Sequence, residues 1–154
     1  MAGLALSFPL SGNVIGKNDS INLAIIGLGS KVKIGGKGKQ DLRDFAKIPG
    51  VNIVAVCDCD EDIMNEEVQK LKNENIKVKA YRDFRKLLDD RDIDAVSIAT
   101  PNHTHALITV MACQAGKHEF CQKPASHNIF EGCRTFGNKI VLDRIVQVPH
   151  VPRF

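Results

Sequence analysis

The sequence predicts an α/β protein whose single three-layer domain is built on a doubly wound parallel sheet. Three observations support this class. Short apolar segments alternate with helical patterns from Ile21 onward, which is typical of βαβ units. The apolar segments are nearly continuous, which indicates strands buried on both faces. The length of 154 residues fits one domain with its own core.

Six segments are expected to form strands, because each is short, rich in apolar or β-branched residues and bounded by turn residues. Right-handed crossovers, with a reversal of direction after the third strand, predict the sheet order 3-2-1-4-5-6. In chain order, the expected strands are 22–27, 51–58, 76–81, 93–100, 117–121 and 144–148.

Helices are expected between all of these strands, and four segments show a helical pattern. Segment 60–75 has apolar residues at helical spacing, acids in its first turn and lysines later. Segment 83–90 opens with Asp83 as an expected N-cap, and 103–116 ends in a glycine that suits a helix C-terminus. Segment 126–137 contains two glycines and is expected to be a weak helix.

The composition, with 44% apolar and 25% charged residues, is ordinary for a globular protein. A net charge of +3 is too small to indicate nucleic acid binding, and no apolar run reaches the roughly 18 residues of a membrane span. The five cysteines include no C-x-x-C pair. We therefore expect reduced thiols, without a disulfide framework or a zinc ribbon.

Both ends of the chain are expected to lie outside the domain. Residues 1–20 are first apolar and then rich in Ser, Gly and Asn, so we expect a disordered leader or the remnant of a signal. The domain then spans 21–148, and 149–154 form an extended tail with two prolines. A cytoplasmic location is the default expectation, and an exported or periplasmic one follows if Met1 lies inside a longer signal.

The loop after the first expected strand carries Gly27 and Gly29, the first two glycines of the pattern G-x-G-x-x-G. In a dinucleotide-binding fold the first allows a tight turn, and the second lets the backbone approach a pyrophosphate. Ser30 and Lys31, from the same loop, are also candidate cofactor-binding residues. The third position is Val32 rather than glycine. The pattern is therefore incomplete, and a generic strand–helix turn is the alternative.

Asp58 ends the second expected strand, where a carboxylate can accept hydrogen bonds from both hydroxyls of an adenosine ribose. A 2′-phosphate would be repelled there, so NAD is favoured over NADP. Lys31 or Lys33 could soften this preference by pairing with a phosphate, which keeps NADP open as a cofactor. The other interpretation of Asp58 is an N-cap for the next helix.

Two further loops are expected at the same edge of the sheet, because the first, fourth and fifth strands are neighbours in this order. Lys123, after the fifth strand, could exchange protons with a substrate only where burial or a nearby positive charge favours its neutral form. The alternative is a surface lysine at the end of a strand. The H-x-H pair at 103–105 suggests helix capping rather than zinc, since no other ligand has suitable spacing. The candidates from these loops are Thr100, Pro101, Asn102, His105, Gln122 and Lys123.

Together these residues resemble the N-terminal cofactor domain, a Rossmann fold, of the Gfo/Idh/MocA family of nicotinamide-dependent oxidoreductases. By resemblance, Lys123 lies near the nicotinamide and the substrate and assists proton transfer, while Asn102 and His105 lie beside the cofactor. The implied reaction is hydride transfer at a hydroxyl-bearing carbon of a sugar or polyol. The stretches that carry the resemblance, within roughly 21–148, are AIIGLGS, VAVCD, DAVSIATPNHTHA, AGKH and CQKPASHN.

Three features depart from the family. Gln122 stands where the family has Glu and brings no negative charge beside Lys123, and Val32 replaces a small residue. Family members continue into a second α/β domain that binds the substrate, and 154 residues leave no room for it. We therefore expect cofactor binding with little or no turnover by this chain alone, a separate chain that supplies the missing domain, and self-association through an exposed apolar patch.

Two other functions stay open at this point. A non-catalytic nucleotide-binding module, or the remnant of a gene, would fit Gln122 and the length of the chain. A methyltransferase that uses S-adenosylmethionine also pairs a glycine-rich loop with an acid after the second strand. That reading leaves Thr100-Pro101 and Lys123-Pro124 unexplained.

Overall fold

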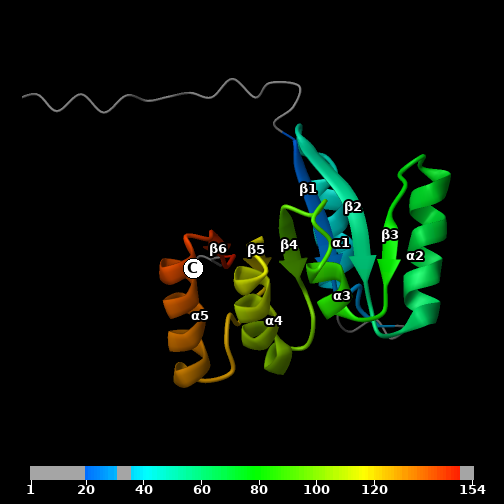
Figure 1. Ribbon diagram of the computed structural model, residues 1–154. Coiled ribbons are helices and arrows are strands. Elements are labelled where there is room, and N and C mark those ends of the chain that lie inside the picture. Colours follow the sequence, from blue (N-terminus) through cyan, green and yellow to red (C-terminus); the bar gives the residue numbers. More distant parts are fainter. Residues whose placement is uncertain (1–19, 31–35, 150–154) are drawn as a thin grey trace, which may run out of the picture.

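The computed structural model describes residues 20–30 and 36–149. In this part of the chain, strands and helices alternate as predicted (Figure 1). The predicted leader and tail fall almost wholly outside the described residues. The strands are β1 (Ile21–Ile26), β2 (Val51–Cys57), β3 (Lys79–Tyr81), β4 (Ala95–Ile98), β5 (His118–Cys121) and β6 (Val146–Gln147). The helices are α1 (Lys37–Phe45), α2 (Glu61–Asn73), α3 (Phe84–Leu88), α4 (Asn102–Gln114) and α5 (Ile129–Leu142).

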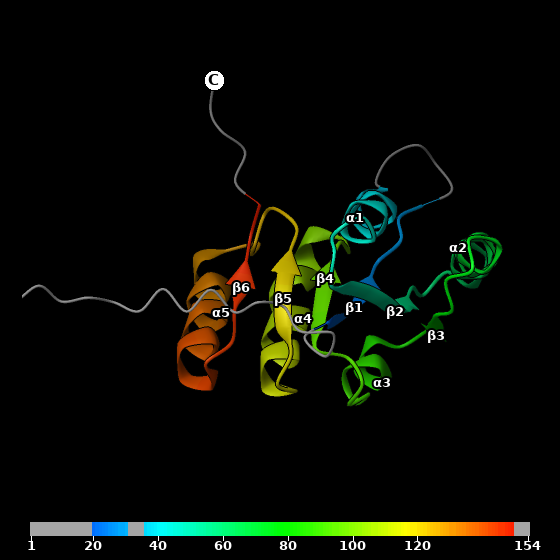
Figure 2. The same cartoon turned by 90° about the horizontal axis from the view of Figure 1, so that it is seen from above.

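The strands form one parallel sheet in the order β3-β2-β1-β4-β5-β6, which confirms the predicted fold class and strand order. Helices cover both faces, and Figure 2 shows α1 and α2 on the opposite side of the sheet from α3. The reversal of order lies between β1 and β4. Ligands of open parallel sheets bind at this point, outside the carboxyl ends of the strands.

Alternate residues of β1 enter two different hydrophobic cores, as a strand buried on both faces requires. Leu23 and Ile25 pack with residues of α1 and α2, such as Leu42 and Leu71. Ala24 and Ile26 pack on the other face with residues of α3 and α4. The continuous apolar pattern of the strands is thus explained by a helical layer on each side.

Local capping explains where several helices begin and end. The Asp83 side chain accepts a hydrogen bond from the backbone N–H of Arg85 (3.0 Å), which confirms it as the N-cap of α3. Gly116, with φ of 78°, follows the end of α4 as predicted. The last helix differs from prediction, because it starts at Ile129 and runs to Leu142.

Asn128 and Glu131 explain the later start of α5. The Glu131 backbone N–H donates to Asn128 Oδ1 (2.9 Å), and the backbone N–H of His127 donates to Glu131 Oε2 (2.8 Å). The first bond makes Asn128 the N-cap of α5, and the second links Glu131 to the residue before that cap. No described helix is both long enough and apolar enough to cross a membrane.

Glu119, on β5, is a carboxyl group inside the fold. Its side chain is 4% exposed. The Cys113 thiol of α4 donates a hydrogen bond to Glu119 Oε1 at 2.9 Å. Burial raises the pKa of Glu119 from 4.5 to about 7, against a smaller opposing effect of the Cys113 hydrogen bond.

We expect this raised pKa to make the fold less stable as the pH rises. Below pH 4.5 the carboxyl group is protonated in both folded and unfolded chains, so it has no effect. Between pH 4.5 and about 7 only the unfolded chain releases the proton, and stability falls by about 3 kcal/mol at most. The carboxyl group of Asp90, whose pKa is lowered to about 2, does not titrate in this range and so does not add to this pH dependence.

Urea unfolding of the wild-type chain and of Glu119→Gln at several pH values tests this expectation. The carboxamide cannot ionise, so the variant should match the wild type near pH 4 and exceed it in stability at pH 8. An equal difference between the two chains at every pH would contradict the raised pKa of Glu119.

Candidate functional site

A cleft of about 830 Å³ lies outside the carboxyl ends of β1, β2, β4 and β5. This is the edge of the sheet toward which the arrowheads of β2 and β4 point in Figure 1. Its volume is within the range of small-molecule and cofactor sites. Lys31, Val32 and Lys33 lie outside the described residues. All the other candidates named from the sequence line the cleft, namely Gly27, Gly29, Ser30, Asp58, Thr100, Pro101, Asn102, His105, Gln122 and Lys123.

The glycine loop after β1 packs directly on the loop after β4. Gly27 has φ of 88°, a backbone conformation that side chains rarely allow. A Cβ atom on it would lie 2.9 Å from backbone atoms of Ala99 and Thr100. The first glycine of the pattern therefore allows both the turn and the close approach of the two loops.

Gly38, in the first turn of α1, makes the close helix–strand contact that the third glycine of the pattern provides. A Cβ atom on Gly38 would lie 1.7 Å from the backbone oxygen of Gly27. Val32, where the sequence pattern is incomplete, lies outside the described residues. The structure assigns the close contact to Gly38, which lies further along the chain than the third position of G-x-G-x-x-G. The run Gly-Gly-Lys-Gly at 35–38 was the available signal in the sequence.

Asp58, directly after β2, holds the glycine loop in place. Its Oδ2 accepts a hydrogen bond from the backbone N–H of Leu28 (2.7 Å), and its Oδ1 accepts one from that of Asp60 (2.9 Å). The N-cap of α2 is Asp60, whose side chain accepts from Asp62 and Ile63. The capping interpretation of Asp58 is therefore wrong, and the 8% exposed carboxylate is part of the cleft wall.

His105 joins the loops that follow β4 and β5. It is 1% exposed, and its Nδ1 and Nε2 lie 2.7 Å from the backbone oxygens of Pro124 and Thr100, respectively. The capping interpretation of this histidine is therefore wrong. At the start of α4, Thr104 Oγ1 lies 2.8 Å from both Thr100 Oγ1 and the Pro101 carbonyl oxygen, either of which can accept its proton.

The turn after β5 contains a buried and an exposed member of the site. Gln122 is 7% exposed, and its Nε2 donates to Asp41 Oδ2 of α1 at 2.7 Å. Lys123 follows as an exposed residue that lines the cleft. Sequence reasoning did not identify Asp41, which comes from a helix more than 80 positions earlier.

Two cations at the cleft were also missed. Lys37, the first residue of α1, and Arg82, which follows β3, both line it. Arg82 is paired with Glu61 at 2.9 Å. The predicted strand order contained the signal for Arg82, because β3 and β2 are parallel neighbours whose carboxyl ends lie together. Among the described residues, no group of three or more His, Cys, Asp or Glu side chains could hold a metal ion.

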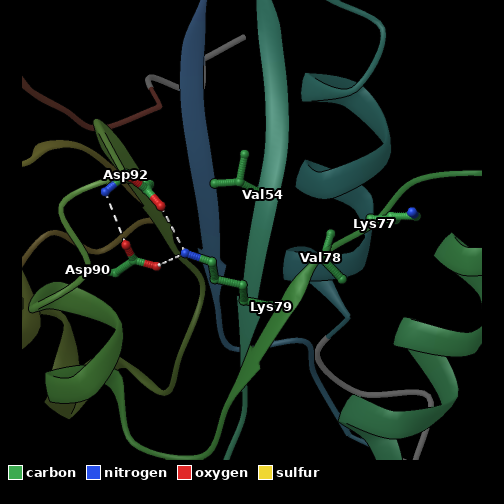
Figure 3. Close-up of a pocket in the computed structure, with 6 residues that line it drawn as sticks. All are labelled: Val54, Lys77, Val78, Lys79, Asp90 and Asp92. Carbon is green, nitrogen blue, oxygen red and sulfur yellow. Dashed lines mark hydrogen bonds and ion pairs between the residues drawn. The ribbon is translucent and has the colours of Figure 1, made fainter.

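A second hollow of about 360 Å³ lies toward the amino ends of β3 and β4. Figure 3 shows Lys79 pointing to Asp90 and Asp92, with Nζ–oxygen distances of 2.8 and 3.0 Å. The pKa of Asp90 is lowered to about 2, chiefly by the hydrogen bond from Lys79 and then by those from the Asp92 backbone N–H and the Tyr81 hydroxyl. Lys79 is paired with the two aspartates, and these ion pairs link β3 to the segment before β4.

The parallel sheet, the glycine contacts on both sides of the first loop and the acid after β2 define a Rossmann nucleotide-binding domain. Residues 21–139 match the family model described as "Oxidoreductase family, NAD-binding Rossmann fold". The chain belongs to this family, Gfo/Idh/MocA, and forms the NAD-binding domain of such oxidoreductases. The match supports a nicotinamide dinucleotide as the cofactor.

Curated relatives include an inositol 2-dehydrogenase of Salmonella typhimurium, 37% identical over 94 residues that cover 60% of this chain and 27% of that protein. A glycosyl hydrolase family 109 protein of Shewanella pealeana is 29% identical over 125 residues, which cover 78% and 26% of the two chains. The chain thus spans about a quarter of the length of these relatives. The structure of a probable dehydrogenase from Thermotoga maritima matches with a TM-score of 0.73 and 28% identity, over 83% of this chain and 35% of that one.

Proposed function

We propose that the chain binds NAD(H) in this cleft and serves as the cofactor domain of an oxidoreductase acting on a hydroxyl-bearing carbon of a sugar or polyol. The observation that carries the proposal is the convergence of the glycine loop, Asp58 and Lys123 on one cleft. Relatives named as inositol dehydrogenases act on a polyol, which supports the substrate class.

The glycine loop and the start of α1 fit a pyrophosphate. Gly27 and Gly38 bring strand, loop and helix closer together than a side chain would allow. The backbone N–H groups of the first turn of a helix attract anions, and Gly29 and Ser30 line the cleft together with Lys37 of that turn. Lys37 adds a positive charge there, and Lys31 stays a candidate phosphate partner.

Asp58 fits the adenosine ribose. Each carboxylate oxygen accepts one backbone N–H and keeps lone-pair capacity for a ribose hydroxyl. The negative charge disfavours a 2′-phosphate, so we propose NAD as the preferred cofactor. Arg82, which also lines the cleft, would attract such a phosphate, so NADP is the alternative that a binding experiment must include.

Lys123 is the residue we propose for proton transfer. The bound cofactor accepts or supplies the hydride, and the lysine amine exchanges a proton with the substrate hydroxyl. Thr100, Pro101, Asn102 and His105 would shape the nicotinamide end, because they line the cleft beside Lys123. His105 contacts the backbone oxygens of Thr100 and Pro124, and so links the loops that follow β4 and β5.

Binding and turnover are tested separately. We expect NADH added to the purified chain to bind, as measured by its fluorescence. We expect little or no change in NADH absorbance with a panel of sugars and polyols that includes inositol. A separate chain with a substrate domain would restore turnover. Steady hydride transfer by this chain alone would contradict the second expectation and exclude a non-catalytic module.

Self-association is a further proposal, carried by apolar residues at the start of α5. Ile129 and Phe130 are 87% and 69% exposed, and exposed neighbouring apolar groups favour association. We expect light scattering to show species larger than a monomer at high concentration, and Ile129→Ser with Phe130→Ser to reduce them. Ile48→Ser, at an exposed residue before β2, is the matched control. A wild-type chain that stays monomeric would contradict the proposal.

A further inference from the structure

Asp41 of α1 is a buried carboxylate that the proposed cofactor contacts do not use. It is 4% exposed. Its Oδ2 accepts a hydrogen bond from Gln122 Nε2 at 2.7 Å and lies 3.5 Å from Ser97 Oγ of β4. Its Oδ1 lies 3.3 Å from Lys37 Nζ. One carboxylate therefore contacts its own helix, the central strand and the turn after β5.

The contact with Asp41 explains which side chain suits position 122. The Gln122 carboxamide donates to the carboxylate, and both groups are buried. A carboxylate at position 122 would instead face that of Asp41 at hydrogen-bond distance. Two buried like charges that close must share a proton or move apart. The negative charge that Gln122 lacks is thus present next to it, on α1.

The same carboxylate lies between two parts of the cleft wall. Lys37 is at the start of α1, where the proposed pyrophosphate contacts are, and Gln122 precedes Lys123 in the chain. Lys37, Gln122 and Lys123 all line the cleft, whereas Asp41 lies behind them. Buried charge-assisted hydrogen bonds are short and directional, so this pair can fix α1 relative to the turn that carries Lys123.

We propose that Asp41 is a positioning residue of the dinucleotide site, which holds Lys37 with one oxygen and Gln122 with the other. It sets the spacing between the phosphate-binding helix and the Lys123 turn, and it makes a carboxamide the required partner at position 122. This proposal rests on the proposed binding of NAD(H). Its structural part, the pairing of Asp41 with Gln122, stands without the cofactor.

A swap of the two side chains tests the proposal. Gln122→Glu should weaken NADH binding by about 10-fold or more at pH 8 and less at pH 5, because the two carboxylates share a proton only at low pH. Asp41→Asn alone should weaken binding, since Lys37 loses its partner. The double variant D41N/Q122E restores one carboxylate and one carboxamide, and should bind NADH more tightly than Q122E and with little dependence on pH.

Asp44→Asn is the matched control, because Asp44 is an exposed carboxylate of the same helix that pairs with Lys47. It should leave NADH affinity unchanged. Thermal unfolding of the same variants without cofactor measures the pairing separately: the midpoint of Q122E should fall from pH 5 to pH 8 relative to the wild type, and the double variant should recover it.

Different results would contradict the proposed function and the proposed role of Asp41. If the wild type does not bind NADH, the proposed function fails, while unfolding still reports on the pair. If Q122E binds NADH like the wild type at both pH values, Asp41 does not position the site. If the double variant unfolds no better than Q122E at pH 8, the pairing itself is contradicted.

Discussion

Gly38→Ala is expected to lower the free energy of unfolding by about 3 kcal/mol or more, the upper end for an overpacked site. The new methyl group would lie 1.7 Å from the Gly27 backbone oxygen, and backbone atoms cannot rotate away. Helix α1 must therefore move off β1. That movement would displace Lys37 and Asp41, so NADH affinity should fall with stability. Urea unfolding and NADH titration measure the two effects.

Gly137→Ala is the matched control, because no contact within 4 Å is found for a Cβ atom at this position of α5 among the described residues beyond its own helix backbone. Alanine is favoured over glycine inside a helix by about 1 kcal/mol, so this variant should be at least as stable as the wild type and should bind NADH equally well. A G38A variant with wild-type stability would show that α1 does not approach β1 this closely.

Asp58→Ala has the second large expected effect, mainly on cofactor affinity. Removal of the carboxylate leaves the Leu28 N–H, in a fully buried residue, without its partner, which costs about 1 to 3 kcal/mol of stability. The proposed ribose bonds are lost as well. Hydrogen bonds to a charged group contribute about 1.5 to 3 kcal/mol, so NADH affinity should fall by about 10- to 150-fold.

Asp60→Ala is the control that separates the loss of stability in Asp58→Ala from its loss of NADH affinity. Asp60 caps α2 and does not line the cleft, so its loss should lower stability by about 0.5 to 2 kcal/mol and leave NADH affinity unchanged. Equal NADH affinity in D58A and D60A would contradict the role proposed for Asp58.

The strand order and the edge that carries the cleft could be predicted because they follow from patterns along the chain. Each strand is a continuous apolar segment, and the βαβ connections have one hand. Once the order is known, the residues after β1, β2, β4 and β5 must meet, and the structure places them in one cleft. Asp83 and Gly116 were predictable for a similar reason, since a cap depends on its near neighbours.

The residues that were missed depend on packing between distant segments. Gly38 could not be recognised from a fixed spacing, because the loop before α1 is longer than the usual pattern. The choice between Asp58 and Asp60 as the cap of α2 depends on β2 ending at Cys57. Asp41 looks like a solvent-facing helix residue in the sequence, and only the position of α1 against β4 and β5 buries it beside Gln122.

Calorimetric titration of the purified chain with NADH, NADPH and S-adenosylmethionine tests the central claim most directly. We predict that NADH binds most tightly, that NADPH binds more weakly because of Asp58, and that S-adenosylmethionine does not bind. Preference for S-adenosylmethionine, or no heat of binding with either nicotinamide cofactor, would contradict the proposed NAD(H) site.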